Sequence, residues 1–214
     1  MDPLRMALIG CGNRGTSAYL PPIRKMTNHI KLVAVCDESE DAAKSAGESE
    51  GVPYYTSVEG LMDAQELDFV CVVVKPDRNA EVSLKLIHAG IHLMTETPIA
   101  TTVEDADKMI AAAQENNIKL ETAENYYRRP TERIKRELIL AGVFGNVNVV
   151  YSDFVGHGYH GVGLLRSYIG FDVKVTRVTG FVHDYPIQNH IWRAGQPPRN
   201  TENWQHGVLE FENN

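Results

Sequence analysis

A glycine-rich turn that directly follows a short apolar run constrains this chain more than any other feature. Residues 6–9 are apolar, and Gly10, Gly12 and Gly15 follow in the spacing Gly-x-Gly-x-x-Gly. Gly10 would allow a tight turn, Gly12 would let the backbone approach a pyrophosphate, and Gly15 would let the next helix pack on the strand. Free N–H groups at a helix N-terminus favour phosphate charge. The pattern predicts a dinucleotide site, with a plain structural turn as the alternative.

An acidic residue follows the second apolar run at a matching distance. Residues 30–36 are apolar apart from Lys31 and end in Asp37, where a carboxylate can bind an adenosine ribose. Glu38 beside it would repel a 2′-phosphate, so we expect NAD rather than NADP. Asn13 and Arg14, inside the turn, are further predicted cofactor contacts. Arg14 is expected at the pyrophosphate, and its alternative role is that of a solvent-facing residue at a helix start.

Length, charge and cysteine content exclude several classes of protein. The 214 residues, 43% of them hydrophobic, can bury a core and form one domain plus part of another. A net charge of −7 provides no cationic surplus for nucleic acid or an anionic membrane, so neither partner is expected. The three cysteines lack C-x-x-C spacing, which indicates reduced thiols. With no leader pattern and no membrane-spanning apolar run, we expect a cytoplasmic protein.

Residues 1–124 alternate between apolar runs and helical patterns. Pro21 and Pro22 are expected to interrupt the helix after the glycine turn. Thr102, and the capping-box stretch Thr56-Ser57-Val58-Glu59, predict two helix starts. The runs predict an α/β fold, a doubly wound parallel sheet of Rossmann type. Its expected strands are 6–9, 30–36, 54–55, 69–74, 91–94 and 120–123.

In such a sheet, ligands lie beyond the carboxyl ends of the strands. The glycine turn, Asp37 and the segments after the fourth and fifth strands should therefore face one crevice. These later segments contribute further predicted cofactor-binding residues, which are Val74, Lys75, Pro76, Asn79, Glu96 and Thr97.

The pattern changes at residue 125, where a second, α+β domain is predicted over 125–214. Helices are expected at 131–141 and 161–169, and strands at 147–154, 173–182 and 208–211. The strands predict an open, mostly antiparallel sheet that looks incomplete. Because an unfinished sheet exposes an edge, we expect either a partner there, such as a second copy of the chain, or a fragment of a longer protein.

Taken together, these motifs resemble the Gfo/Idh/MocA family of nicotinamide-dependent sugar and polyol oxidoreductases. The matching stretches are the glycine turn, Asp37, the strand end before Pro76, His88-Ala89-Gly90 leading to Glu96-Thr97-Pro98, and Gly158-Tyr159-His160 leading to Gly170. The resemblance implies a Rossmann domain followed by an open-faced sheet domain. It also implies a carbohydrate substrate between the domains and a nicotinamide at the end of the Glu96-Thr97-Pro98 loop.

The chain departs from the family pattern at several positions. The usual Glu-Lys-Pro is Glu96-Thr97-Pro98, so Thr97 stands where a lysine normally contacts the reacting hydroxyl. Gly156 and Gly163 replace usual aspartates, and Asn79 replaces a common histidine. Of the usual catalytic set, only His160 remains.

Oxidation of a secondary alcohol needs a base and a group that steadies the developing alkoxide. His160 is the predicted base, since imidazole titrates near neutral pH, and its alternative role is to cap the helix at Gly161. Lys75 is a predicted substitute for the missing lysine, and its alternative is a solvated lysine at a strand end. Thr97 is the third predicted catalytic residue, because it occupies the position of the usual lysine.

Aromatic and guanidinium groups suit a hydroxyl-rich ring. The predicted substrate-binding residues are Tyr126, Arg128, Tyr159, His160 and Trp192, with interdomain packing as the alternative. Asp153, His157 and His160 lack the spacing of a standard zinc motif, so no metal is predicted.

Three functions fit these residues. The first is an NAD-dependent oxidoreductase that acts on a hydroxyl of a sugar, polyol or glycoside. The second is an NAD-dependent glycosidase that breaks a glycosidic bond by transient oxidation and elimination. The third is a catalytically inactive NAD-binding relative, which the missing lysine and aspartates favour.

Overall fold

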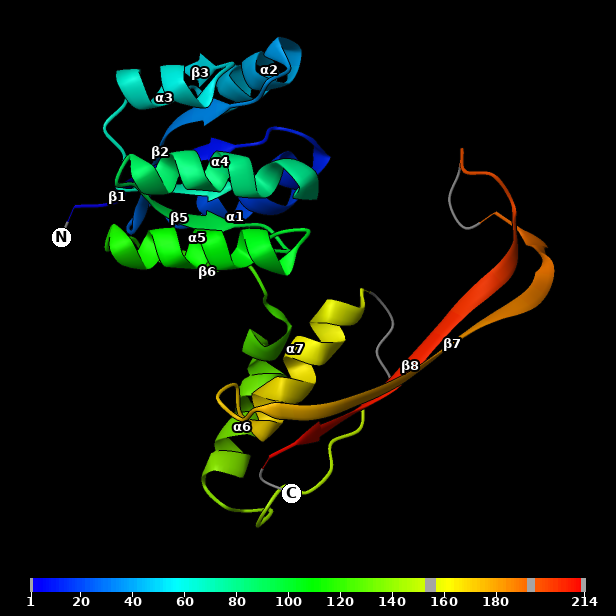
Figure 1. Ribbon diagram of the computed structural model, residues 1–214. Coiled ribbons are helices and arrows are strands. Elements are labelled where there is room, and N and C mark those ends of the chain that lie inside the picture. Colours follow the sequence, from blue (N-terminus) through cyan, green and yellow to red (C-terminus); the bar gives the residue numbers. More distant parts are fainter. Residues whose placement is uncertain (1, 153–156, 192–194, 213–214) are drawn as a thin grey trace. The chain divides into compact units, whose positions relative to one another are not determined.

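The computed structural model describes residues 2–152, 157–191 and 195–212 (Figure 1). The chain divides into two compact units, residues 1–125 and 126–214, and each is described by itself.

The first unit contains a six-stranded sheet in the order β3-β2-β1-β4-β5-β6, and all of its strand pairs are parallel. The predicted doubly wound fold is therefore confirmed. The chain builds outward from β1 in one direction and from β4 in the other, so the ends of β1 and β4 form the switch point where such sheets bind ligands. The strands are β1 (Leu4–Ile9), β2 (Ile30–Cys36), β3 (Tyr54–Tyr55), β4 (Phe69–Val72), β5 (His92–Thr95) and β6 (Leu120–Thr122).

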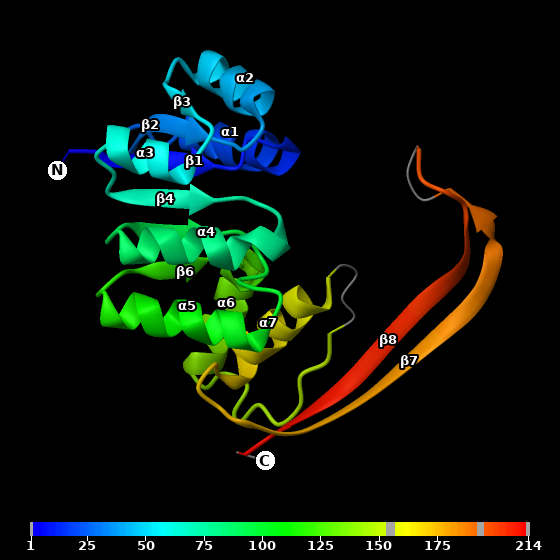
Figure 2. The same ribbon diagram turned by 45° about the horizontal axis from the view of Figure 1, so that its top comes forward.

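Helices cover both faces of this sheet (Figures 1 and 2). One face packs against α3 (Val58–Ala64), α4 (Pro76–His88) and α5 (Val103–Glu115). The other face packs against the π-helical turn η1 (Gly15–Tyr19), α1 (Leu20–Ile23) and α2 (Glu40–Glu50).

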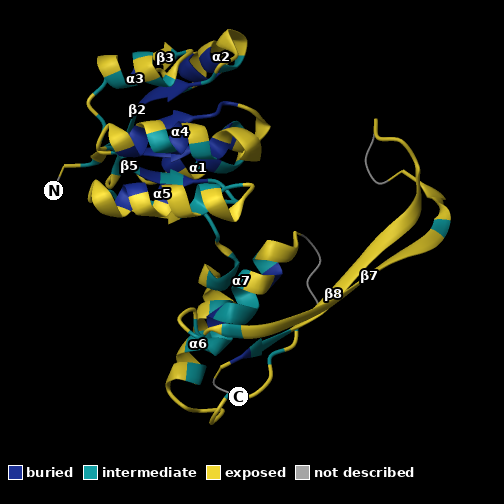
Figure 3. Ribbon diagram, in the orientation of Figure 1, coloured by how far each residue is buried: buried dark blue, intermediate teal, exposed yellow. Residues whose placement is uncertain are grey.

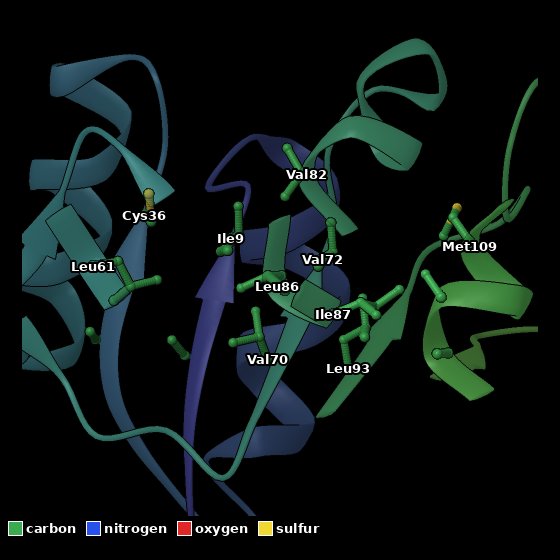
Figure 4. Packing of buried hydrophobic residues seen from close by; sticks show 14 residues of the cluster. Ile9, Cys36, Leu61, Val70, Val72, Val82, Leu86, Ile87, Leu93 and Met109 are labelled. Atoms are coloured by element: carbon green, nitrogen blue, oxygen red, sulfur yellow. The ribbon is translucent and has the colours of Figure 1, made fainter. Parts of the chain in front are cut away.

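The core follows from the two-residue period of the strands. Along β1, Ala7 and Ile9 point to the face with α4, whereas Met6 and Leu8 point to the face with α1. On the first of these faces, β4 residues such as Val70 contribute to one cluster with side chains from α3, α4 and α5 (Figure 4). The continuous apolar runs in the sequence reflect strands that are covered on both faces.

The two prolines after the glycine turn do not interrupt the helix, contrary to the prediction. Pro21 and Pro22 lie in the first turn of α1, directly after η1. Proline is tolerated in a first turn because its missing N–H is not needed there. Before the prolines the helix has widened to i→i+5 hydrogen bonding, and the Leu20 N–H donates to the Gly15 carbonyl.

Two predicted helix starts are present in the structure. Thr102 caps α5, with its hydroxyl accepting the Asp105 N–H at 3.1 Å. At α3 the cap is Ser57 rather than Thr56, and it accepts the Gly60 N–H at 3.1 Å.

The second unit contains η2 (Tyr126–Arg128), α6 (Pro130–Leu140), α7 (Gly158–Ile169), and an antiparallel pair formed by β7 (Val175–His190) and β8 (Arg199–Phe211). The predicted helices correspond to α6 and α7, although α7 begins three residues before 161. The predicted strands 173–182 and 208–211 are parts of the longer β7 and β8.

The strand predicted over 147–154 is not formed in residues 147–152, and residues 153 and 154 lie outside the described range. Val149 and Tyr151 are 85% and 88% exposed, although their alternation is typical of a strand. A strand needs a neighbour for its backbone groups, and this segment pairs with neither β7 nor β8.

Most of β7 and β8 is exposed on both faces of the pair (Figure 3). The exposed side chains include Val178, Phe181, Val182 and Trp204. Association of two chains through this sheet stays a prediction. None of the helices in the described ranges is long and apolar enough to cross a lipid bilayer.

Candidate functional site

Four loops of the first unit leave the carboxyl ends of neighbouring strands. The glycine turn follows β1, Asp37 follows β2, residues 73–75 follow β4 and residues 96–99 follow β5. Because the strands are parallel and adjacent, these loops share one edge of the sheet. The structure thus brings together the predicted cofactor-binding segments of residues 1–124.

The three glycines of the turn are needed for different reasons. Gly10 has a φ of +99°, and a Cβ on it would lie 2.2 Å from the Val73 carbonyl oxygen. A Cβ on Gly15 would lie 2.0 Å from the Gly10 carbonyl oxygen. A Cβ on Gly12, by contrast, would have no atom of the described chain within 4 Å. Packing therefore explains Gly10 and Gly15, whereas Gly12 leaves open space in front of the turn, which fits the approach of a pyrophosphate.

Asp37 is held against the glycine turn by backbone donors. Its Oδ2 accepts the Cys11 N–H at 2.7 Å and its Oδ1 accepts the Ser39 N–H at 2.9 Å. The carboxylate is therefore fixed at the tip of β2, where a ribose can hydrogen-bond to it. Cys11 and Cys36 lie beside it as free, buried thiols. Burial, with a contribution from Asp37, raises the pKa of each of these two thiols to about 12.

Glu96, the first residue of the loop after β5, is tied to the helix that follows the glycine turn. Its Oε1 accepts hydrogen bonds from Arg14 Nε at 3.2 Å and Nη2 at 2.9 Å, and its Oε2 accepts one from the Tyr19 hydroxyl. Thr97 Oγ1 donates to the same Oε1 at 3.4 Å. Tyr19 was missed by sequence reasoning, because no local pattern marks the π-helical turn that carries it. Contact between Arg14 and a pyrophosphate stays a prediction.

Asn79, in α4, holds the same loop by hydrogen bonds to its backbone. The side chain is 2% exposed, and its Nδ2 donates to the carbonyl oxygens of Pro98 at 3.1 Å and Ile99 at 2.9 Å. Its Oδ1 accepts hydrogen bonds from the hydroxyls of Ser83 and Thr95. In this arrangement the amide holds the loop, and its polar atoms are directed at protein groups.

Asn79→Ala should therefore destabilise the loop after β5. The partly buried Pro98 and Ile99 carbonyls would lose their donor, which costs about 2 kcal/mol of unfolding free energy. Thermal or urea unfolding of the 214-residue chain measures this loss. The surface variant Asn116→Ala, which removes one bond to the Ala112 carbonyl, should cost less than half as much. Equal losses for the two variants would contradict the supporting role of Asn79.

Residues 74–76 lie at the switch point, next to the loop after β5. Lys75 is the exposed N-cap residue of α4, and Pro76 is the first residue of that helix. β4 and β5 are hydrogen-bonded neighbours, with Val72 opposite Thr95. Lys75 and Thr97 therefore extend from adjacent strand ends, as expected from the sequence.

In the second unit, Tyr126, Tyr159 and His160 form one cluster of rings. The His160 centroid lies 4.7 Å from that of Tyr126 and 4.4 Å from that of Tyr159. His157 stacks on Tyr159 at 5.5 Å, and the Arg129 guanidinium lies 3.9 Å from the Tyr126 centroid. Sequence reasoning named the first three as site residues, considered His157 only as a metal ligand and missed Arg129.

One other predicted residue of this unit, Arg128, is described by the structure. Arg128 Nε and Nη2 donate to the Tyr127 hydroxyl, each at 3.3 Å. Trp192 and Asp153 lie outside the described residues. Within the described ranges, no three side chains of His, Cys, Asp or Glu gather so that they could hold a metal ion.

Comparisons with known proteins agree with the fold and with the family resemblance. The Gfo/Idh/MocA family model, described as an oxidoreductase family with an NAD-binding Rossmann fold, matches residues 4–123. The chain is 30% identical over 141 residues to a 1,5-anhydro-D-fructose reductase of Ensifer adhaerens, covering 66% of this chain and 42% of that protein. It is 25% identical over 153 residues to a dTDP-3,4-didehydro-2,6-dideoxy-alpha-D-glucose 3-reductase of Streptomyces violaceoruber, covering 71% and 44%.

A solved structure with the same fold is the WlbA dehydrogenase of Chromobacterium violaceum, in complex with NADH and UDP-GlcNAcA. It matches with a TM-score of 0.73 and 26% identity, over 86% of this chain and 59% of that one. The chain thus spans less than half the length of the two curated relatives named above. The family model covers more than half of the chain, so the protein belongs to the Gfo/Idh/MocA oxidoreductase family, with its NAD-binding Rossmann fold in residues 4–123.

Proposed function

We propose that this chain is the dinucleotide-binding domain (1–124) and part of the substrate domain (125–214) of an NAD-dependent oxidoreductase. The reaction would transfer a hydride between the nicotinamide and a secondary hydroxyl of a sugar, polyol or glycoside. The observation that carries the proposal is the shared edge of the sheet. There the open Gly12, the fixed Asp37 carboxylate, the loop that ends at Lys75 and the loop that begins at Glu96 follow neighbouring strands.

The residues at this edge fit a dinucleotide. Gly10, Gly12, Asn13, Arg14 and Gly15 would hold the pyrophosphate, because backbone N–H groups and a guanidinium favour its charge. Asp37 would accept hydrogen bonds from the adenosine ribose. Val74, Lys75, Pro76, Glu96 and Thr97 would line the nicotinamide side of the crevice, and Asn79 would hold the Glu96 loop in place.

NAD is favoured over NADP by charge at the end of β2. Both oxygens of Asp37 accept backbone N–H groups, so this carboxylate cannot easily turn away from a ligand. Glu38 follows it and is exposed. A 2′-phosphate near these two carboxylates would be repelled, whereas a ribose hydroxyl could donate to Asp37.

Thermal unfolding of the 214-residue chain with NAD and with NADP tests this proposal. At a concentration about 100-fold above Kd, a ligand that binds only the folded state adds about 2.7 kcal/mol. For a chain of this size, that raises the midpoint by roughly 5 to 10 °C. We expect this rise with NAD and a clearly smaller one with NADP at the same concentration.

Asp37→Asn should reduce the preference for NAD, measured as the ratio of the NADP and NAD dissociation constants, about tenfold. The substitution removes the negative charge and keeps one acceptor oxygen. Asp41→Asn, which removes an exposed carboxylate in the first turn of α2, is the matched control and should leave the preference unchanged. No midpoint rise with either dinucleotide would contradict the proposed function, whereas a larger rise with NADP would contradict only the preference for NAD.

The nicotinamide, when bound, supplies the hydride acceptor or donor. His160 would take the hydroxyl proton as the C–H hydride leaves, so that the alcohol becomes a carbonyl. Lys75 or Thr97 would hydrogen-bond the developing alkoxide at the neighbouring strand ends. His160 suits its task because its ring lies against Tyr126 and Tyr159, which restricts its orientation.

A carbohydrate is the proposed substrate. Tyr126, Arg128, Tyr159, His160 and Trp192 are types of residue that bind hydroxyl-rich rings through aromatic faces and N–H groups. The names of the relatives support this class, because they include reductases of an anhydro sugar and of a nucleotide-linked sugar.

Thr97 stands where the family usually has a lysine, and this change favours a second candidate function, that of an NAD-dependent glycosidase. In that reaction oxidation is transient, and elimination then breaks the glycosidic bond. Product analysis separates the two activities, because a glycosidase releases free sugar without net formation of NADH.

A further inference from the structure

Three side chains meet at the Glu96 carboxylate and connect two loops of the first unit. Arg14 lies in the glycine turn, Tyr19 lies at the end of η1, and Thr97 follows Glu96 after β5. We call Arg14, Tyr19, Glu96 and Thr97 the Glu96 cluster. Arg14 and Tyr19 lie 82 and 77 positions before Glu96 in the sequence, yet both donate hydrogen bonds to its carboxylate.

The π-helical turn allows Arg14 and Tyr19 to reach the same group. Five residues in an α-helix span about 1.4 turns, so positions 14 and 19 would point about 140° apart. In η1 the hydrogen bonds run from i to i+5, as between Leu20 N–H and the Gly15 carbonyl. A residue and its fifth successor then lie on the same side of the helix. An ordinary helix in this place would direct the Tyr19 hydroxyl away from Glu96.

Burial makes Tyr19 a lasting hydrogen-bond donor. It belongs to the buried apolar cluster that includes Leu8 and Leu20, and the residue is 9% exposed. Desolvation, and the hydrogen bond to Glu96, raise the pKa of Tyr19. The hydroxyl therefore stays protonated and donates to Oε2, while Oε1 remains available to Arg14.

Arg14 is bound to Glu96 by only one edge of its guanidinium. Nε and Nη2 both donate to Oε1, and the side chain is still 60% exposed, compared with 15% for Glu96. Within the described part of the chain, Nη1 makes no hydrogen bond. A guanidinium has five N–H donors in a rigid plane, so one edge can be held while another faces an anion.

We propose that Tyr19 is a positioning residue, which acts through Glu96 to hold Arg14 at the glycine turn in an orientation ready for the cofactor pyrophosphate. This inference rests on the proposed function. Glu96 then also supports Arg14, and the same carboxylate links the glycine turn to Thr97. Rigid placement of Arg14 raises affinity because less side-chain freedom is lost on binding.

Dissociation constants of NADH and ADP-ribose for the 214-residue chain and its variants test the proposal. ADP-ribose contains the pyrophosphate but no nicotinamide, so it tests the phosphate contact without a contribution from the nicotinamide. Tyr19→Phe should weaken both ligands about fivefold, and Arg14→Ala should weaken both about tenfold or more. Glu96→Gln, which keeps an acceptor oxygen but loses the charge, should lie near Tyr19→Phe.

The decisive comparison is Tyr19→Phe in the Arg14→Ala background. If Tyr19 acts through Arg14, adding Tyr19→Phe to the Arg14→Ala variant should change the dissociation constants less than twofold. A merely structural Tyr19 would weaken binding equally in both backgrounds, which would overturn the proposal. Tyr54→Phe, at an exposed position, is the control and should bind as the unchanged chain does.

The possible failures are distinguishable. If the unchanged chain binds neither NADH nor ADP-ribose, the proposed function fails and this inference fails with it. If it binds both and Tyr19→Phe binds equally well, only the inference fails. Should Tyr19→Phe unfold at a much lower temperature, Glu96→Gln in the two Arg14 backgrounds decides by the same criterion, because it leaves the Tyr19 ring in the core.

Discussion

Gly15→Ala should destabilise the first unit by about 3 kcal/mol, whereas Gly12→Ala should leave its stability unchanged and weaken dinucleotide binding. The added Cβ at position 15 would lie 2.0 Å from the Gly10 carbonyl oxygen, which belongs to the backbone. No flexible side chain can move aside, so the turn or the start of the helix must shift. Gly10→Ala should be at least as harmful, because it combines a 2.2 Å approach to the Val73 carbonyl with a φ of +99°.

Gly12→Ala tests the open side of the same turn. Its Cβ meets nothing in the described chain within 4 Å, so folding should tolerate it. If a pyrophosphate lies against this backbone, the methyl group occupies its place and weakens NADH binding roughly 10- to 100-fold. Urea unfolding and NADH fluorescence titration measure the two effects on the same preparations.

Gly51→Ala is the matched control. Gly51 caps α2 with a φ of +66°, and a Cβ there would have no neighbour within 4 Å in the described chain. The substitution therefore isolates the cost of a left-handed backbone, about 1 kcal/mol, and should leave NADH affinity unchanged. Unaltered NADH binding by Gly12→Ala would contradict the proposed position of the pyrophosphate, and a stable Gly15→Ala would contradict the packing argument.

His160→Asn should lower turnover about 100- to 10,000-fold, the usual contribution of a general base. The proton of the substrate hydroxyl would then have no acceptor of suitable basicity. NADH affinity should not change, because the predicted cofactor contacts all lie in residues 1–124. The assay is NADH formation from a panel of sugars, polyols and glycosides, with released sugar measured in parallel.

His157→Asn is the control for His160→Asn. His157 stacks on Tyr159 and lies 6.2 Å from His160 between ring centroids, so its loss disturbs the same cluster without removing the proposed base. We expect less than a tenfold effect on turnover. Equal losses for the two variants would indicate that His160 only supports the ring cluster.

Lys75→Met extends this comparison to the proposed alkoxide partner. Methionine keeps much of the apolar stem and removes the ammonium, so turnover should be abolished while NADH still binds. Unchanged turnover would exclude Lys75 from catalysis and leave Thr97 as the remaining candidate at these strand ends.

Patterns along the chain were sufficient to predict the Rossmann sheet and the segments at the carboxyl-terminal edge of its strands. Apolar runs identify strands that are buried on both faces, and parallel strands bring their carboxyl ends to one edge. Asp37 and Glu96 could therefore be placed from sequence order alone. Local patterns gave a wrong prediction where a strand depends on a neighbouring strand to pair with. Residues 147–152 alternate like a strand but pair with neither β7 nor β8.

The contacts within the site required the tertiary structure. That Asn79 supports the Glu96 loop, and that Tyr19 binds Glu96, depends on groups that are distant in sequence. The different needs for Gly12 and Gly15 also emerge only from the space around each glycine. Hydrophobic period and glycine spacing are local properties of the chain, so the sequence was enough to predict the parallel sheet and the edge at which we propose that a dinucleotide binds. Side-chain partners depend on how helices and loops pack, so only the three-dimensional structure decides which residues hold the others in place.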